Sequence, residues 1–262
     1  MAWAVVTGGS RGLGAAAALA LAADGFDVVV TYRENREAAL GVTEKLTAMG
    51  RESLAVHLAL DDLAAVEAFA REVSAARRPL ALVNNAGEPF PEGLGDVDLA
   101  AAERLVRVNT LAPLALVKGL ADALGSHERP GAVVNVSSVV ARGGSNGSSV
   151  YAASKAALHG LTRTLAVELA PRVRVNAVLP GVLATDMNAG ALADERRARA
   201  ARELIPLGRI GEPSECGAVV AFLASERASY VTGALIPIDG GVLARLALPG
   251  RRGRDREANE SA

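Results

Sequence analysis

Short apolar runs rich in Val alternate with longer stretches of helical periodicity along most of the chain. The apolar runs predict seven strands, at residues 3–7, 27–32, 53–58, 80–84, 132–137, 172–179 and 234–238. Between them, apolar residues recur every three or four positions, for example at Val66, Phe69, Ala70 and Val73. This spacing predicts helices. Strands that alternate with helices are typical of βαβ units, so we expect an α/β fold, a Rossmann-type doubly wound parallel sheet with helices on both faces.

Two further helices and two exceptional segments complete the pattern. Leucines at helical spacing follow Tyr151, and Pro213 suits the first turn of a helix that runs to about Leu223. Residues 187–205, where arginines crowd among alanines, predict a helical insert that we interpret as a lid. Residues 246–262 are polar and charged, so we expect a disordered tail. The sequence therefore predicts one domain over residues 1–245, followed by this tail.

Composition narrows the classes of protein. Half of the 262 residues are apolar but only 3% are aromatic, so the core must be built from Ala, Val and Leu. A net charge of −1 argues against nucleic acid or an anionic membrane as the main partner, because such binding needs a concentrated basic field. The apolar run at residues 15–23 is too short to span a bilayer, and no signal peptide is recognisable, so we expect a cytoplasmic protein.

Cysteine and histidine usage predicts neither a disulfide nor a metal site. Cys216 is the single cysteine, and its place in a predicted helix favours a role as a small buried hydrophobe. The three histidines are His57, His127 and His159, and none has a partner at a metal-ligand spacing. We interpret His159 as a surface or packing residue of its helix.

A glycine-rich turn from Thr7 to Gly14 lies between the first strand and an Ala-rich helix. Glycines at 8, 12 and 14 allow a tight turn and close approach to a pyrophosphate, while the N-terminus of the helix offers free N–H groups. An ordinary turn is the alternative, but the strand and helix that a dinucleotide site requires are both predicted here. No Gly-Lys-Ser/Thr follows, which excludes a P-loop NTPase.

Tyr151 and Lys155 are four residues apart, so they share one face of a helix. A free tyrosine has a pKa of about 10, and a fixed positive charge beside it would lower this value. By itself such a pair is typical of a solvated helix face. Its weight comes from the motifs that accompany it.

These motifs occur in the order seen in short-chain dehydrogenases/reductases, which the chain resembles over residues 2–243. They are the glycine turn, Asn84-Asn85-Ala86-Gly87, Ser138, Tyr151-x-x-x-Lys155 and Pro180-Gly181. Asp239-Gly240-Gly241, with Val231-Thr232-Gly233 before it, is most similar to the 3-oxoacyl-carrier-protein reductases and polyketide ketoreductases of that family. The resemblance implies an oxidoreductase that reduces a ketone to a secondary alcohol, in fatty acid or polyketide biosynthesis. The same features occur in alcohol, sugar and steroid dehydrogenases.

Hydride transfer to a ketone generates alkoxide character on oxygen, so the site needs a proton donor and hydrogen-bond donors. Tyr151 is the candidate proton donor, and Ser138 would donate to the carbonyl oxygen. The resemblance implies that Lys155 lowers the Tyr151 pKa and bonds the nicotinamide ribose, and that Asn109 positions a water linking Lys155 to solvent. Each residue has a plain alternative, since serines could end a strand and asparagines could form turns. Ser137 is the less favoured serine, by resemblance alone.

The second strand ends in Tyr32-Arg33, without the carboxylate that accepts from the ribose of NAD. Arg33 and Arg11 suit a 2′-phosphate, although both could be solvated surface residues, so we predict NADPH (NADP+) as cofactor. The resemblance extends the cofactor contacts to Gly8, Ser10, Arg11, Gly12, Leu13, Gly14, Arg33, Leu60, Asn85, Ala86, Gly87, Tyr151, Lys155, Pro180, Gly181, Leu183 and Thr185.

The chain departs from the family pattern at two places. After the third strand, Ala59-Leu60 stand where an Asp or Asn near the adenine is usual, and Asp61 follows two positions later. Glu88 follows Gly87 where apolar residues are common, so it could touch substrate or solvent. Arg129 and Arg172 stand where carrier-dependent reductases present basic residues to an acyl carrier protein, although exposed arginines are usually just solvated.

The substrate is a small or carrier-bound carbonyl compound whose identity the lid sequence does not reveal. The resemblance implies a homodimer or homotetramer formed through helices around residues 105–124 and 158–169. Two rival functions stay open: an alcohol, sugar or steroid dehydrogenase working oxidatively, and a non-catalytic dinucleotide-sensing protein. A sensor needs no proton donor, so the set of Asn109, Ser138, Tyr151 and Lys155 argues against it.

Overall fold

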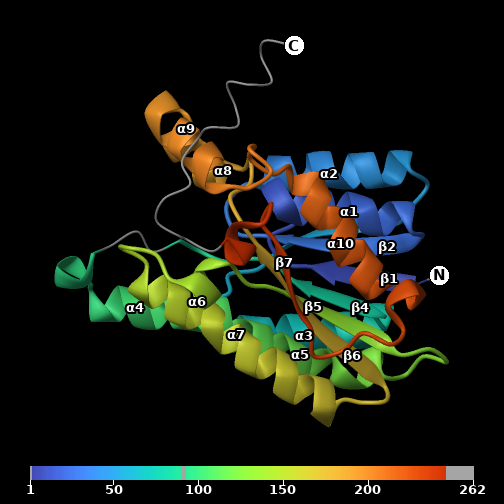
Figure 1. Cartoon of the computed structure of the whole chain (residues 1–262). Coiled ribbons are helices and arrows are strands. Elements are labelled where there is room, and N and C mark those ends of the chain that lie inside the picture. Colours follow the sequence, from blue (N-terminus) through green and yellow to red (C-terminus); the bar gives the residue numbers. More distant parts are fainter. Residues whose placement is uncertain (1, 90–92, 246–262) are drawn as a thin grey trace.

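The computed structural model describes residues 2–89 and 93–245, within which seven strands form one parallel sheet (Figure 1). The strands are β1 (Ala2–Val6), β2 (Phe26–Tyr32), β3 (Ser53–His57), β4 (Ala81–Asn84), β5 (Gly131–Val136), β6 (Val173–Pro180) and β7 (Leu235–Ile238). Their spatial order is β3-β2-β1-β4-β5-β6-β7, and each neighbouring pair is parallel. The predicted fold class is confirmed, and each predicted strand ends within one residue of the observed one.

Helices cover both faces of the sheet (Figure 1). One face carries α1 (Gly12–Ala23), α2 (Arg36–Ala48) and α10 (Pro213–Ala224), and the other carries α3 (Leu63–Arg77), α5 (Ala112–Leu124) and α7 (Ser149–Glu168). The shorter α4 (Leu99–Val106) and α6 (Val140–Gly143) pack near α7. Short 3₁₀ turns occupy Leu94–Asp96, Glu226–Ala228 and Val242–Ala244.

The long helix expected around residues 105–124 is interrupted. A π-helical turn, Arg107–Leu111, separates α4 from α5. By contrast, α8 (Asp186–Leu192) and α9 (Glu195–Leu204) match the helical insert expected at residues 187–205, and α9 projects from the body of the molecule (Figure 1). The tail predicted at residues 246–262 lies outside the described residues. In the described part of the chain, no helix combines the length and apolarity needed to cross a membrane.

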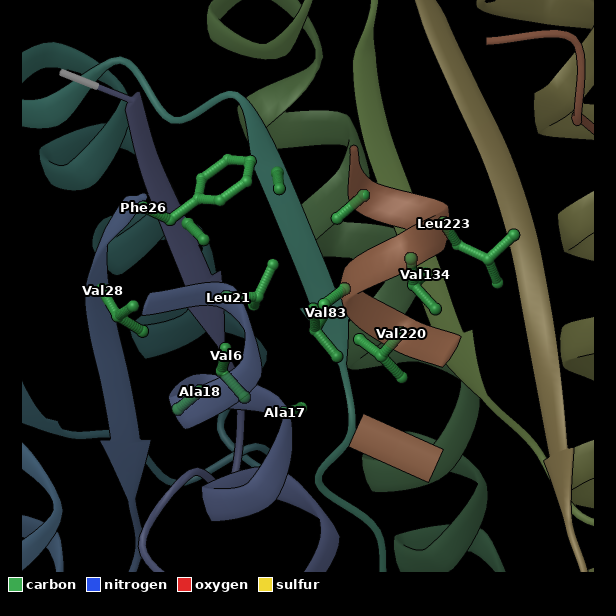
Figure 2. Packing of buried hydrophobic residues seen from close by; sticks show 14 of the residues in the cluster. Val6, Ala17, Ala18, Leu21, Phe26, Val28, Val83, Val134, Val220 and Leu223 are labelled. Carbon is green, nitrogen blue, oxygen red and sulfur yellow. The ribbon is translucent and has the colours of Figure 1, made fainter. Parts of the chain in front are cut away.

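Small residues let α1 and α10 approach each other closely, and Figure 2 shows Ala17 of α1 on the side that faces Val220 of α10. A Cβ on Gly217 would lie 2.8 Å from the backbone carbon of Ala16, so this contact requires glycine. Cys216 is fully buried in the same layer, and burial raises the pKa of its thiol to about 12. This agrees with its predicted role as a buried hydrophobe.

The sheet order reverses beside β1, whose two neighbours are β2 and β4. In open α/β sheets, ligands bind at such a switch point, outside the carboxyl ends of the strands. The ends of β1, β4, β5 and β6 lead directly to the glycine turn, residues 85–88, the two serines and residues 181–185. The fold therefore gathers the sequence motifs at one edge of the sheet.

Candidate active site

A cleft of about 1260 Å³ lies at this edge. Its lining includes Ser138 and every residue predicted to contact the cofactor, from Gly8 in the glycine turn to Thr185 after β6. Asn109, the fourth predicted catalytic residue, is fully buried behind this lining. The structure thus brings the predicted site residues together at one edge of the sheet.

The glycine turn is shaped for a close-lying ligand. Gly8 and Gly12 have φ angles of +62° and +53°, in the left-handed region that favours glycine. A Cβ on Gly14 would lie 2.2 Å from the Gly8 carbonyl oxygen, so only glycine fits there. No side chain caps the N-terminus of α1 and no acidic residue occupies its first turn, which suits an anion. These residues fit a dinucleotide pyrophosphate.

Thr7 and Asn85 hold the turn in place. Thr7 Oγ1 accepts hydrogen bonds from the backbone N–H groups of Asn85 and Ala86, both at 3.0 Å. In return, Asn85 Nδ2 donates to the carbonyl oxygens of Thr7 at 2.9 Å and Gly8 at 3.2 Å. The Asn85 side chain therefore supports the turn in addition to lining the cleft. Sequence reasoning missed Thr7, whose only signal was a polar side chain at the end of a buried strand.

Ser138, Tyr151 and Lys155 line one end of the cleft. Burial raises the pKa of Tyr151, and its hydrogen bond with Ser138 opposes this shift. Lys155 Nζ donates a 2.9 Å hydrogen bond to the carbonyl oxygen of Val136, and burial lowers the pKa of Lys155 to about 8. The expectation that Lys155 lowers the Tyr151 pKa is not met: burial raises this pKa, and the group that opposes the shift is the Ser138 hydroxyl. Tyr151 is thus a neutral phenol near pH 7, which is the form that can donate a proton.

Asn109 lies on the π-helical turn, a feature that often marks functional sites. Its Oδ1 accepts from the Glu88 N–H at 3.0 Å, and its Nδ2 donates to the Glu88 carbonyl at 3.2 Å and to Ser154 Oγ at 3.1 Å. These bonds join the loop after β4 to α7. A Cβ on Gly87 would lie 3.0 Å from Asn109 Oδ1 and 2.8 Å from Lys155 Nζ, so both polar groups lie against this glycine.

Ser137 anchors α7 to the end of β5. Its Oγ donates to the Lys155 carbonyl at 2.9 Å and lies 2.8 Å from His159 Nε2. Burial lowers the pKa of His159, and the charges of Arg163 and Arg142 add to this effect. The packing role predicted for His159 agrees with these contacts, and the preference for Ser138 gains a physical reason, since Ser137 is engaged elsewhere.

Charged side chains surround the other end of the cleft. Arg33 pairs with Glu88, and its guanidinium also lies 3.8 Å from Asp61 and 3.9 Å from Glu34. Arg104, on α4, forms two bonds with Glu88, at 3.1 and 2.5 Å. Sequence reasoning missed Arg104 because no motif surrounds it and its importance comes from a contact between distant segments. Leu60, predicted near the adenine, is buried in the cleft wall.

Arg129 and Arg172 lie away from the cleft. They precede β5 and β6, at the amino ends of these strands, so the sheet separates them from Tyr151. Arg129 pairs with Glu226 at 2.8 Å. A carrier protein that docked on them would not face the cleft of the same subunit.

A switch-point cleft with a glycine turn, a half-buried phenol and a buried ammonium defines the site of a dinucleotide-dependent oxidoreductase. Among the described residues, no three His, Cys, Asp or Glu side chains gather as metal ligands would. Residues 8–243 match the model of a family described as enoyl-(acyl carrier protein) reductase. Together with the similarities that follow, this match shows that the chain belongs to the short-chain dehydrogenase/reductase family.

Similar proteins have several described activities. The chain is 37% identical over 247 residues to the 3-oxoacyl-(acyl-carrier-protein) reductase FabG of Staphylococcus aureus, covering 91% of this chain and 97% of that protein. Among solved structures, the chain is similar to a protein of Beutenbergia cavernae assigned as an NAD(P)-dependent gluconate 5-dehydrogenase and crystallised with NADP at low occupancy. The two are 36% identical with a TM-score of 0.88, and the match covers 93% of this chain and 97% of that one. A blue fluorescent protein from a metagenomic library, crystallised with NADPH, is 37% identical with a TM-score of 0.85, covering 92% and 97%.

Proposed function

We propose that the protein catalyses the NADPH-dependent reduction of a ketone to a secondary alcohol, with a 3-oxoacyl thioester as the preferred class of substrate. The arrangement of Ser138, Tyr151 and Lys155 at one end of the cleft carries this proposal. Similarity to FabG supports the choice of thioester.

When bound, the reduced nicotinamide supplies a hydride to the carbonyl carbon. Ser138 and Tyr151 hold the carbonyl oxygen between two hydroxyl groups, and the phenol gives its proton to that oxygen as negative charge develops. Lys155, whose pKa is about 8, can then return a proton to the phenolate near neutral pH. Asn109 fixes the loop that carries Gly87 against the Lys155 ammonium.

The cofactor preference is supported by the residue that follows β2, Arg33, a cation at the position where an NAD enzyme is expected to have a carboxylate. Arg11, the N-cap residue of α1, is a second cation in the lining. Relatives crystallised with NADP or NADPH agree with this assignment.

A second candidate function is the oxidation of a sugar acid or polyol with the same residues. The structural similarity to a gluconate dehydrogenase favours it. In either case we propose a cytoplasmic homo-oligomer in which α8 and α9 form the lid over the substrate. Exposed apolar side chains on the helices around α4 and α7, such as Leu99, Leu111 and Val167, support an interface there.

NADPH consumption with acetoacetyl thioesters, simple ketones and keto sugars tests the proposal, alongside NADP+ reduction with gluconate and polyols. We expect turnover to be fastest with the thioester. Tyr151→Phe should keep cofactor affinity within about twofold and lose roughly 10²- to 10⁴-fold in kcat, because only the proton donor is removed. Turnover of sugars alone would favour the second function, and NADPH binding without turnover of any compound would indicate a sensor.

A further inference from the structure

Four charged side chains form a network at the end of the cleft lined by Arg33 and Leu60. Glu88 Oε1 accepts hydrogen bonds from Arg33 and from Arg104, and Oε2 accepts from Arg104 at 2.5 Å. Asp61 Oδ2 lies 3.8 Å from Arg33 Nη2 and 3.5 Å from Arg104 Nη1. Two cations thus meet two anions, and a third carboxylate, Glu34, lies 3.9 Å from Arg33.

The Arg33–Glu88 contact runs across the cleft. Arg33 follows β2 and Glu88 lies in the loop after β4, while β1 and its glycine turn lie between them (Figure 1). Strands separated by one neighbour are about 10 Å apart, so the two side chains must extend towards each other from opposite sides of the turn. A ligand on the glycine turn that engages Arg33 must share this guanidinium with Glu88.

The two arginines hold Glu88 unequally. Arg104 binds both carboxylate oxygens, and this pairing raises the pKa of Arg104. Arg33 contacts only one oxygen, and its remaining carboxylate neighbours, Asp61 and Glu34, lie at 3.8 and 3.9 Å. Bidentate pairing to a carboxylate fixes its orientation. Glu88 therefore has one firm partner, Arg104, and one exchangeable partner, Arg33.

We propose that Glu88 is an internal competitor for Arg33, occupying the guanidinium that the 2′-phosphate of NADPH binds. This inference rests on the proposed NADPH dependence. The phosphate displaces Glu88 from Arg33, while Arg104 keeps the released carboxylate paired. NADH has no 2′-phosphate and leaves the Arg33–Glu88 pair intact. Glu88 therefore weakens the binding of NADPH and reduces the preference of the site for NADPH over NADH.

The test is calorimetric titration of Glu88→Gln, which needs no turnover. We expect the Kd of NADPH, and that of adenosine 2′,5′-bisphosphate, to fall roughly two- to fivefold, the range of a partly exposed ion pair. The Kd values of NADH and 5′-AMP should stay unchanged. Glu226→Gln, which removes the exposed pair with Arg129 on the opposite edge of the sheet, is the matched control and should change none of them.

Two further backgrounds separate competition from other roles of these residues. In Arg104→Gln, Glu88 has only Arg33 as its arginine partner, so it should compete more strongly and NADPH should bind more weakly. The double variant Glu88→Gln/Arg104→Gln has no competing carboxylate at position 88, so it should regain the affinity of Glu88→Gln. In an Arg33→Gln background, Glu88→Gln should have no effect on NADPH. A double variant that stays as weak as Arg104→Gln would show that Arg104 itself binds the phosphate and would overturn the competition.

Other results also overturn the inference. Weaker NADPH binding by Glu88→Gln would mean that Glu88 positions Arg33, and equal tightening of NADH would mean that Glu88 acts elsewhere on the dinucleotide. Equal affinity of wild type and Glu88→Gln for adenosine 2′,5′-bisphosphate would exclude competition. A chain whose bisphosphate binding responds as expected but which reduces no ketone would contradict the proposed function and leave the role of Glu88 standing.

Discussion

Gly87 lies directly against the ammonium group of Lys155, since a Cβ at Gly87 would be 2.8 Å from Nζ. The same Cβ would be 3.0 Å from Asn109 Oδ1. Lys155 is buried and bonded to the Val136 carbonyl, and Asn109 is fixed by three hydrogen bonds, so neither group has an easy alternative position. The loop after β4 thus determines where the buried ammonium lies.

Gly87→Ala should therefore impair catalysis more than folding. Displacing Lys155 Nζ would misalign the proposed proton relay, and we expect kcat/KM for ketone reduction to fall roughly 10- to 100-fold. Gly41→Ala is the control, because Gly41 lies in α2 with no atom within 4 Å of the added Cβ. It should keep full activity and gain about 0.5–1 kcal/mol of stability. Steady-state kinetics and urea unfolding measure both, and unchanged kinetics in Gly87→Ala would contradict this role for the glycine.

The pH dependence of ketone reduction should report Lys155. Its pKa is about 8, whereas that of Tyr151 is raised by burial, so the lysine loses its proton first as pH increases. Because kcat/KM follows ionisations of the free enzyme, it should be level below about pH 8 and fall about tenfold per pH unit above it. A pH–rate profile with a single thioester measures this limb. A profile that stays level to about pH 10 would mean that the Lys155 proton is not needed.

The buried ammonium of Lys155 should also lower the free energy of unfolding at neutral pH. Its pKa in the folded chain is about 8 against an ordinary value of 10.5, so between these values the unfolded chain holds a proton that the folded chain has lost. The free energy of unfolding then rises with pH between about 8 and 10.5, and the destabilisation by the charged lysine is fully present below pH 8. Lys155→Met should raise the free energy of unfolding at pH 7 by on the order of 2 kcal/mol, after allowing for the lost bond to Val136.

Urea unfolding at pH 7 and near pH 10 checks this prediction, because the gain should shrink at the higher pH. Lys118→Met is the matched control, since Lys118 is exposed and pairs with Glu67 at 3.6 Å. It should change stability little at either pH. A Lys155→Met chain that is less stable than wild type at pH 7 would refute the argument.

The sequence predicted the strands closely because their Val-rich runs are local signals. The same holds for Gly8, Gly12 and Gly14, because the turn itself requires a positive φ angle or the absence of a Cβ at these positions. The π-helical turn at Arg107–Leu111 escaped prediction, since one extra residue in a turn hardly alters helical periodicity.

The network of Arg33, Asp61, Glu88 and Arg104 could not be predicted from the sequence for a different reason. Arg104 acquires its role through Glu88, sixteen residues away along the chain, and through Arg33, which follows another strand. The direction of the Tyr151 pKa shift depends on a balance between burial and neighbouring groups. Residue spacing placed Lys155 on the right face of the helix but could not show that its ammonium bonds to the Val136 carbonyl.

Arg174 should be the arginine on which the fold depends most. It is buried in β6, and its guanidinium donates to the carbonyl of Leu223 at 2.8 Å and to that of Ser225 at 3.0 Å, at the end of α10. The last carbonyls of a helix have no partner within the helix, so Arg174→Met would leave buried acceptors unpaired. We expect a loss of about 3 kcal/mol in the free energy of unfolding.

Arg174→Lys should recover only part of this loss, because one ammonium group cannot reproduce the planar, forked donors of a guanidinium. Arg129→Met, which removes an exposed ion pair with Glu226, should cost less than about 1 kcal/mol. Urea unfolding of the three variants measures these losses in the free energy of unfolding. An equal loss in Arg174→Met and Arg129→Met would show that the bonds from Arg174 to the buried carbonyls stabilise the fold no more than an exposed ion pair does.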